Sequence, residues 1–215
     1  MHRFFVEADT GIGGELVLGE GDSQHAARVL RLQPGEGIEV LDGRGGVRDC
    51  RITHVERRRV AARVLGLRQQ GRAPAVELAV AVLKGRAMDL LVQKVTELGV
   101  AALHPLLTER TVVRVLPGEE AGKVEGWRVT AMEAAKQCGN AWLPTIHRPV
   151  SLKSFLSRAG GGVLLAGFLD PDATPVDRVL EAWEPGSTEA VMLLLGPEGD
   201  LSPGEQEAVC AVGGR

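Results

Sequence analysis

The chain has 215 residues, 44% of them hydrophobic, which suffices for one large domain or two small ones with buried cores. Its formal net charge of −3 neither indicates nor excludes a nucleic-acid partner, because the total hides how charge is distributed. No apolar run is long enough to cross a bilayer, and the first residues lack the apolar stretch of a signal peptide, so we expect a soluble cytoplasmic protein without membrane contact.

The first seventy residues alternate short β-type runs with glycine turns, a pattern typical of a small barrel or sandwich. Asp42-Gly43 and Gly45-Gly46 can adopt positive φ and so reverse the chain. Either Asp22 or Ser23 is expected to cap a short helix that runs through Leu32. Strands are predicted at residues 3–6, 37–41, 47–55 and 59–67.

Residues 44–72 carry a strong local excess of positive charge, with nine arginines against two acidic residues. Such a segment can bind a polyanion, but a solvated outer face of arginine-rich strands explains the charge equally well. The charge pattern leaves both interpretations open. The arginines are Arg44, Arg48, Arg51, Arg57, Arg58, Arg59, Arg63, Arg68 and Arg72.

The sequence texture changes after residue 72, where we place the boundary between two domains, 1–72 and 73–215. An almost unbroken apolar run over residues 76–83 predicts a strand that is buried on both faces of a parallel sheet.

The remaining chain alternates strand and helix, which predicts an α/β sheet with helices on both faces. A helix over residues 88–98 is expected to end at Gly99 in a left-handed turn. The other elements are predicted as strands at 100–103, 163–166 and 191–195 and helices at 119–137 and 151–158.

The three cysteines are far apart and form no C-x-x-C pair, and no histidine stands at metal-ligand spacing from them. We expect Cys50, Cys138 and Cys210 to be reduced, small buried apolar side chains, and we expect no metal site. A catalytic cysteine is the less favoured alternative.

The last apolar strand is followed by a glycine-rich loop, Gly196-Pro197-Glu198-Gly199-Asp200. Ser202 is a good N-cap, Pro203 suits a first helical position, and Glu205 completes a capping box, so a helix begins there. Ligands of open α/β sheets bind beyond the carboxyl ends of strands, where glycine lets the backbone approach them. Taken alone, the loop is equally well explained as a plain connecting turn.

The run from Leu194 to Glu205 resembles the cofactor loop of the SPOUT class of knotted methyltransferases in the form of the RsmE family. Further RsmE-like segments follow the family order over essentially the whole chain. They are His2-Arg3-Phe4-Phe5-Val6, the segment His25 to Gly35, Lys84-Gly85-Arg86-Ala87-Met88-Asp89, Gln93-Lys94-Val95-Thr96-Glu97-Leu98-Gly99-Val100, Glu109-Arg110 and Glu133-Ala134-Ala135-Lys136-Gln137-Cys138-Gly139.

This resemblance implies a PUA-like, RNA-binding β-barrel over residues 1–72 and an α/β domain with a deep trefoil knot over 73–215, working as a homodimer through the knot domain. It also implies methylation of N3 of uridine 1498 in 16S ribosomal RNA, within the assembled small subunit, with S-adenosyl-L-methionine (SAM) as donor and no metal. Two alternatives stay open: a catalytically impaired RNA-binding protein of the same fold, and a SPOUT methyltransferase that acts on another RNA.

The resemblance also suggests which residues bind cofactor and RNA. Glu198 is expected to accept hydrogen bonds from the ribose or, alternatively, to brace the following helix. We assign no general base. The cofactor residues are expected to be Leu195, Gly196, Pro197, Glu198 and Gly199, and the RNA-binding residues Arg3, His25, Arg28, Arg31, Lys84 and Arg86, each with a surface salt bridge as its alternative role.

Two features depart from the family pattern. Asp200 stands where the family usually has a second glycine, so it either places a carboxylate beside the cofactor or points to solvent. The sequence ends at Arg215, before the family's last strand and threading helix. Because an open knot would expose apolar sheet surface, we expect further residues after Arg215 rather than a defective protein.

Overall fold

The computed structural model describes residues 1–7, 9–72, 75–116, 118–158, 162–169, 173–181 and 190–214. It divides into two compact units. Residues 73 and 74 at the expected domain boundary, and Arg215 at the end of the sequence, lie outside the described residues. Unit 1 comprises Met1–Arg72 and Ala131–Leu143, and unit 2 comprises Ala73–Thr130 and Pro144–Arg215.

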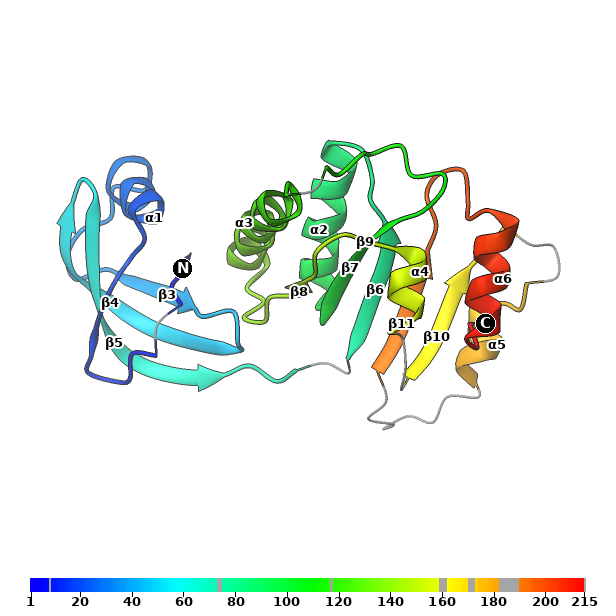
Figure 1. Cartoon of the computed structure of the whole chain (residues 1–215). Coiled ribbons are helices and arrows are strands. Elements are labelled where there is room, and N and C mark those ends of the chain that lie inside the picture. Colours follow the sequence, from blue (N-terminus) through cyan, green and yellow to red (C-terminus); the bar gives the residue numbers. More distant parts are fainter. Residues whose placement is uncertain are drawn as a thin grey trace. The chain divides into compact units, whose positions relative to one another are not determined.

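Unit 1 contains a five-stranded sheet with the order β1-β3-β4-β5-β2 (Figure 1). β1 runs parallel to β3, and the other neighbours are antiparallel. The four predicted strands are confirmed to within two residues, whereas the three-residue β2 was not predicted. The strands are β1 (His2–Phe5), β2 (Glu15–Val17), β3 (Gly37–Leu41), β4 (Gly46–Glu56) and β5 (Arg59–Gln69).

The helix that follows β2 departs from its prediction. α1 (Glu20–Gln24) begins after Gly19, which makes no side-chain cap, and leads into a π-helix, η1 (His25–Val29). Ser23 is buried within α1, where its hydroxyl donates to the carbonyl of Leu18 and accepts from a backbone N–H of β5. The expected cap was therefore wrong: Ser23 and Asp22 lie inside the helix and bond to groups outside it.

Unit 2 contains a six-stranded parallel sheet with the order β10-β11-β6-β7-β8, and β9 also pairs with β7. The predicted strands are confirmed, but β7 continues past the expected end at residue 103. The strands are β6 (Val76–Ala81), β7 (Ala102–Leu107), β8 (Thr145–Ile146), β9 (Val150–Ser151), β10 (Gly162–Gly167) and β11 (Ala190–Leu195).

Pro105 explains why the end of β7 was misjudged. A proline cannot donate to a strand ladder and so argues against a central strand. β7 pairs with β8 at Ala102 and Leu103 and with β9 at Leu106 and Leu107, so Pro105 lies between these two short partners.

The helices confirm most predicted positions. Gly99 ends α2 with φ of 79°, as expected, and Ser151 caps α4 through its hydroxyl. The short α5 was not predicted. The helices are α2 (Arg86–Leu98), α3 (Glu120–Cys138), α4 (Leu152–Leu156), α5 (Val176–Glu181) and α6 (Pro203–Ala211).

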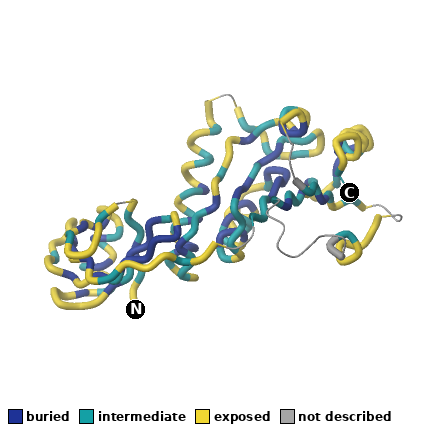
Figure 2. The backbone as a smooth tube through the Cα atoms, turned by 90° about the horizontal axis from the view of Figure 1, so that it is seen from below, coloured by how far each residue is buried: buried dark blue, intermediate teal, exposed yellow. Residues whose placement is uncertain are grey.

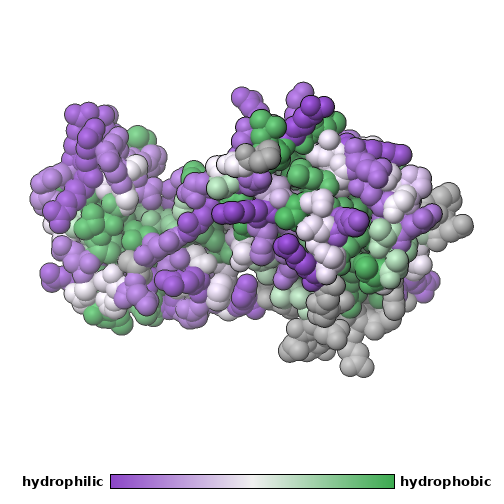
Figure 3. Space-filling view, in the orientation of Figure 1, coloured by the Kyte–Doolittle hydropathy of each residue, from purple (hydrophilic) through white to green (hydrophobic). Residues whose placement is uncertain are grey.

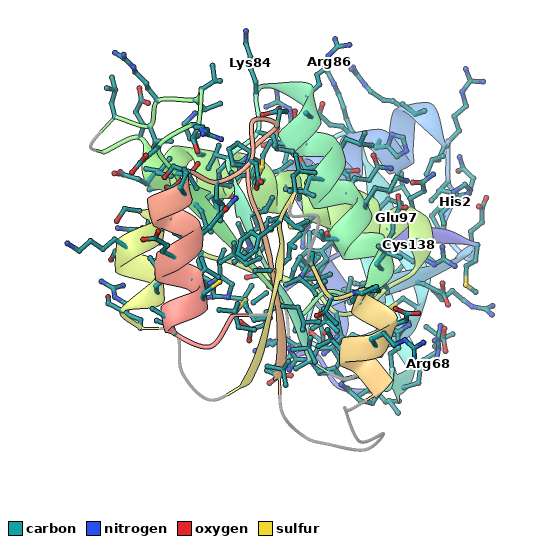
Figure 4. All side chains as sticks on the ribbon, turned by 90° about the vertical axis from the view of Figure 1, so that its right-hand side faces the viewer. His2, Arg68, Lys84, Arg86, Glu97 and Cys138 are labelled. Atoms are coloured by element: carbon teal, nitrogen blue, oxygen red, sulfur yellow. The ribbon has the colours of Figure 1, made fainter. Side chains whose placement is uncertain are left out.

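Both faces of the unit 2 sheet are buried, as the apolar run of β6 predicted (Figure 2). Ala79, Leu106 and Leu194 belong to one core cluster with α4 and α6. Leu78 and Leu103 are buried on the opposite face, because side chains alternate along a strand. Viewed along the sheet, α4 and α6 lie on one side and α2 and α5 on the other (Figure 4).

The cysteine prediction holds for one residue only. Cys50 is buried in the core of unit 1, whereas Cys138 and Cys210 are exposed, so the expectation was wrong for these two. Among the described residues, no helix is long and apolar enough to span a membrane, and no three His, Cys, Asp or Glu side chains are grouped to hold a metal ion.

Asp42 organises the turn between β3 and β4. The residue is 8% exposed, and its carboxylate accepts from the backbone N–H groups of Arg44 and Gly46 at 2.8 and 2.9 Å and from Arg48 Nη1 at 3.0 Å. Burial pushes the pKa of Asp42 upward, but the hydrogen bonds from Arg44, Arg48 and Gly46 outweigh it, and the pKa lies below its ordinary value.

Replacing this carboxylate tests its contribution to stability. Because the folded pKa of Asp42 is lowered, its stabilisation is present above the unfolded pKa of about 4 and is lost as pH falls through the folded value. We expect Asp42→Asn to lose about 3 kcal/mol of unfolding free energy in urea at pH 7, because buried Arg48 then keeps only exposed Asp9, 3.8 Å away, as a carboxylate partner, and less at pH 3. Exposed Glu56→Gln is the control. An equal loss at both pH values would contradict the assignment.

Candidate functional site

Several loops meet at one edge of the unit 2 sheet. β11, β6 and β7 are parallel neighbours, so their carboxyl ends lie at the same edge. The segment after β6 carries Lys84 and Arg86, the loop after β7 carries Arg110, and the loop after β11 is residues 196–200. Ligands of open α/β sheets bind at such an edge, which makes it the candidate site.

The glycine-rich loop is a tight turn with an exposed tip. The backbone N–H of Asp200 donates to the carbonyl of Pro197 at 2.9 Å and closes the turn. A Cβ on Gly196 would lie 3.0 Å from the backbone nitrogen of Leu201, so this position has little room for a side chain. Pro197 is buried, whereas Glu198 and Gly199 are exposed. The turn therefore presents backbone groups and one carboxylate at its tip.

Asp200 holds the loop to its surroundings. It has a φ of 62°, in the left-handed region that favours glycine and that aspartate tolerates better than most residues. Its carboxylate accepts from the N–H groups of Leu201 at 2.7 Å and Leu169 at 3.1 Å and from Gln206 Nε2 at 3.1 Å. The alternative that it simply points to solvent is therefore wrong, and the positive φ explains why glycine suits this position.

Arg110 is a residue of the site to which the sequence analysis gave no role. Its Nη1 donates to the carbonyl of Gly199 at 2.6 Å and also contacts that of Leu201 at 3.4 Å. The sequence alone could not indicate this role, because Arg110 and the loop come together only through the strand order β11-β6-β7. Arg110 fixes the loop from the side opposite Leu169.

The predicted capping box at the start of α6 is confirmed. Ser202 Oγ accepts from the N–H of Glu205, and Glu205 Oε2 accepts from the N–H of Ser202 at 3.0 Å. Glu205 Oε1 also accepts from the backbone of Glu109 at 2.9 Å. Glu205 thus braces the helix, the role considered as an alternative for Glu198, whose carboxylate has no hydrogen bond among the described residues.

Lys84 and Arg86 lie at the start of α2 and point outward from unit 2 (Figure 4). Both are exposed, and neither forms a salt bridge within the described part of the chain. Gly85 between them has a φ of 53°, which turns the chain into the helix. Two cations are therefore available next to the carboxyl end of β6.

A separate pocket in unit 1 brings together two of the predicted RNA-binding residues. Its volume is about 430 Å³. Arg28 and Arg31 are exposed but are not among its lining residues. The pocket is lined by Arg3, Phe4, Gly21, Asp22, His25, Glu133, Lys136 and Gln137.

Lys136 is a second residue to which no function was predicted from the sequence. Its Nζ lies 2.8 Å from Asp22 and 2.6 Å from Glu133. Burial lowers the pKa of Lys136, but the hydrogen bonds to these two carboxylates outweigh it and raise the pKa above its usual value, so the ammonium group stays charged. Arg3 pairs with Glu39 at 2.9 Å and donates to the carbonyl of Gln137 at 3.1 Å. The charged residues that line the pocket are thus held by ion pairs.

The arginines of residues 44–72 fall into two groups. Hydrophilic side chains gather over the end of unit 1 that carries α1 and the β4–β5 turn (Figure 3). Four arginines have internal partners: Arg48 with Asp42, Arg58 with Glu20, Arg68 with Glu39 and Arg72 over the ring of Trp142. Within the described residues, no ion pair engages the other five, the exposed Arg44, Arg51, Arg57, Arg59 and Arg63.

Comparison with known proteins places this arrangement among RNA-modifying enzymes. A family model described as RNA methyltransferase domain matches residues 71–214, and one described as RNA methyltransferase PUA domain matches residues 18–65. The structure is therefore a mixed α/β fold with a PUA domain and an RNA methyltransferase domain.

The relatives narrow this class. Ribosomal RNA small subunit methyltransferase E of Synechocystis sp. is 34% identical over 77% of this chain, which spans 53% of that relative's length. The protein of the same name from Mycobacterium bovis is 28% identical over 98% of this chain and 80% of its own. The same enzyme from Neisseria gonorrhoeae, bound to SAM, has a TM-score of 0.88 and 26% identity over 100% of this chain and 87% of its own. The chain belongs to the RsmE family of RNA methyltransferases.

Substitutions at Asp200 separate its backbone role from its hydrogen bonds. We expect Asp200→Ala to cost about 2 kcal/mol, because it removes an acceptor for three donors and leaves a side chain at positive φ. Asp200→Gly should cost less, since glycine accepts this φ freely. Urea unfolding measures both changes. Equal destabilisation by the two variants would show that the backbone conformation contributes nothing.

Proposed function

We propose that this chain transfers the methyl group of SAM to N3 of uridine 1498 in 16S ribosomal RNA, within the assembled small subunit in the cytoplasm. The observation that carries the proposal is the turn at residues 196–200, fixed by Asp200 and Arg110 at the carboxyl edge of the sheet, in a chain of the RsmE family. Relatives over nearly the full chain carry the name of this enzyme, which supports the choice of RNA.

The residues of the loop suit an adenosine-bearing donor. Gly196 brings backbone close to its surroundings without a side chain, and backbone groups of Leu195, Gly196, Pro197 and Gly199 are proposed to hold the donor. The exposed carboxylate of Glu198, which has no hydrogen bond to another described residue, would accept the ribose hydroxyls. SAM supplies a methyl group activated by a sulfonium, a transfer that requires no metal.

The protein's own task is to align the acceptor and help it lose a proton. Methyl transfer to N3 requires an in-line approach, and the base must be exposed from its stack before N3 is reached. Lys84 and Arg86, which follow β6 at the same edge of the sheet as the loop, are proposed to hold phosphates, and Arg3, His25, Arg28 and Arg31 are proposed to hold RNA on unit 1. No described residue is assigned as the general base.

The finer architecture is part of the same proposal. We propose a PUA-like barrel over residues 1–72 and a SPOUT domain with a deep trefoil knot over 73–215, paired into a homodimer through the knot. The antiparallel pairing of β3, β4 and β5 supports the barrel, and the parallel sheet of unit 2 supports the SPOUT domain.

Methyl transfer is tested on three substrates: small subunits that lack N3-methyluridine, free 16S RNA, and transfer RNA. We expect N3-methyluridine, detected by mass spectrometry of nucleosides, in the small subunits. Gly196→Ala should weaken SAM binding in calorimetry at least tenfold, about 1.4 kcal/mol, because its Cβ meets the backbone of Leu201. Gly204→Ala is the control, since a Cβ there meets no atom within 4 Å.

The outcomes separate the alternatives. Absence of both SAM binding and methyl transfer would contradict the proposal and favour an RNA-binding protein without activity. Transfer to transfer RNA alone would favour a SPOUT enzyme with another substrate.

The exposed arginines at the β4–β5 turn predict a salt effect on RNA binding. Arg57, Arg58 and Arg59 are all exposed at this turn. If they touch phosphates, replacing all three with Ala should reduce the slope of log K against log salt by about 0.7 to 0.9 for each phosphate that is no longer neutralised. Fluorescence anisotropy at several salt concentrations measures this slope, with Lys153→Ala as control. An unchanged slope would assign the cluster to a solvated face.

A further inference from the structure

A cavity in unit 2, separate from the pocket of unit 1, opens on the face of the sheet that packs against α4 and α6. Its volume is about 550 Å³, within the range of about 300 to 1,000 Å³ typical of small-molecule sites. It lies toward the amino ends of the strands, because it is lined by the second residue of β6 and the third residue of β11. The lining residues are Glu77, His104, His147, Arg148, Val150, Phe155, Arg158 and Met192.

Strand alternation explains why polar side chains line part of this cavity. Ala79, Leu106 and Leu194 belong to the core cluster with α4 and α6. Two residues earlier on each strand, on the same face, stand Glu77, His104 and Met192. The apolar face of the sheet thus changes into a mixed polar and apolar surface toward its amino edge.

Three of the polar side chains form a fixed row. Glu77 Oε2 lies 2.7 Å from His104 Nε2. The ring of His104 stacks on the ring of His147 with centroids 4.3 Å apart and planes 10° apart, and Phe155 lies against His104 at 5.4 Å. The glutamate engages the first histidine, so the second faces the cavity without a carboxylate partner among the described residues.

Two arginines supply positive charge to the same cavity. Arg148 follows His147 directly, and Arg158 follows α4. Both are exposed, and neither is ion-paired within the described part of the chain. Glu77 is the one carboxylate among the lining residues, and it already engages His104. The cavity therefore has excess positive charge together with an apolar floor of Val150, Phe155 and Met192.

We propose that this cavity is a second ligand site that binds a phosphate-bearing nucleotide, with the phosphate held by Arg148 and Arg158 and the base placed on Phe155 and Met192. Guanidinium groups match phosphate oxygens geometrically, and aromatic and thioether groups suit a planar base. The nucleotide is either free or one nucleotide of an RNA strand.

The site is distinct from the glycine-rich loop. Met192 lies on β11 and Gly196 follows its last residue, so the two are four residues apart, which corresponds to about 13 Å of extended chain. The loop lies at the carboxyl edge, whereas the cavity lies toward the amino edge. Nucleotide binding here does not depend on methyl transfer at the loop, and the two are measured separately.

His147 gives the site a pH dependence with a defined sign. Burial lowers the pKa of His147, and the charge of His104 lowers it further, whereas Glu77 acts in the opposite direction. At neutral pH His147 is therefore uncharged. As pH falls through its pKa, below 6.5, it joins Arg148 and Arg158 as a cation facing the cavity, and affinity for a phosphate of constant charge should rise.

Calorimetry without SAM tests the proposal on the full chain, with uridine monophosphate, the dinucleotide UpU, uridine and inorganic phosphate as probes. We expect the phosphate-bearing nucleotides to bind more tightly than uridine or inorganic phosphate. The double variant Arg148→Gln, Arg158→Gln should weaken them at least tenfold. Lys153→Gln is the matched control, because Lys153 is an exposed cation on α4 and lines a different cavity.

Each outcome decides one point. Tighter binding of uridine monophosphate supports a free nucleotide, and tighter binding of UpU supports an RNA strand. UpU binding should strengthen between pH 7.5 and 5.5, since its phosphodiester does not titrate there. No nucleotide binding, equal binding of inorganic phosphate, or an unaffected double variant would overturn the proposal. Because SAM is absent, such a result would leave methyl transfer at the loop untouched.

Discussion

The parallel order of the unit 2 strands is the constraint on which the candidate site depends. It places the segments after β10, β11, β6 and β7 at one edge, so residues distant in sequence become neighbours. The turn at 196–200 is held from two sides, by Leu169 after β10 through Asp200 and by Arg110 after β7. Its conformation is therefore fixed by the neighbouring loops as well as by its own glycines.

The same sheet shows how one strand pattern yields two different surfaces. Along β6, β7 and β11, every second residue faces α4 and α6. Where α4 and α6 cover the sheet, the residues on this face are Ala79, Leu106 and Leu194. Toward the amino edge, the equivalent positions can carry Glu77 and His104 without a large desolvation cost, because the two side chains bond to each other and remain partly exposed.

Local signals made much of the fold predictable. The end of α2 at Gly99 and the capping box of Ser202 and Glu205 depend on residues within one helical turn, and both predictions are confirmed. The roles of Lys136 and Arg110 depend on partners far away in sequence: Lys136 bonds to Asp22 across 114 residues, and Arg110 to Gly199 across 89. No spacing in the sequence relates these residues unless the strand order is known. The prediction that Asp22 or Ser23 caps the helix was wrong for the same reason, because both bond to residues outside the helix.

The charge of unit 1 illustrates why counting residues is a poor guide to a binding surface. Arg48 is buried with Asp42, and Arg58 and Arg68 pair with acidic residues outside the arginine-rich segment, so these cations offer less to a polyanion than their number suggests. Exposed Arg51 and Arg63 differ from these paired arginines, because they stand directly opposite each other on β4 and β5. Like charges directly opposite each other are destabilising unless an anion screens them. Glu15 stands opposite Arg63 on β2, so this row carries two cations and one carboxylate and keeps a net positive charge that a bound polyanion would offset.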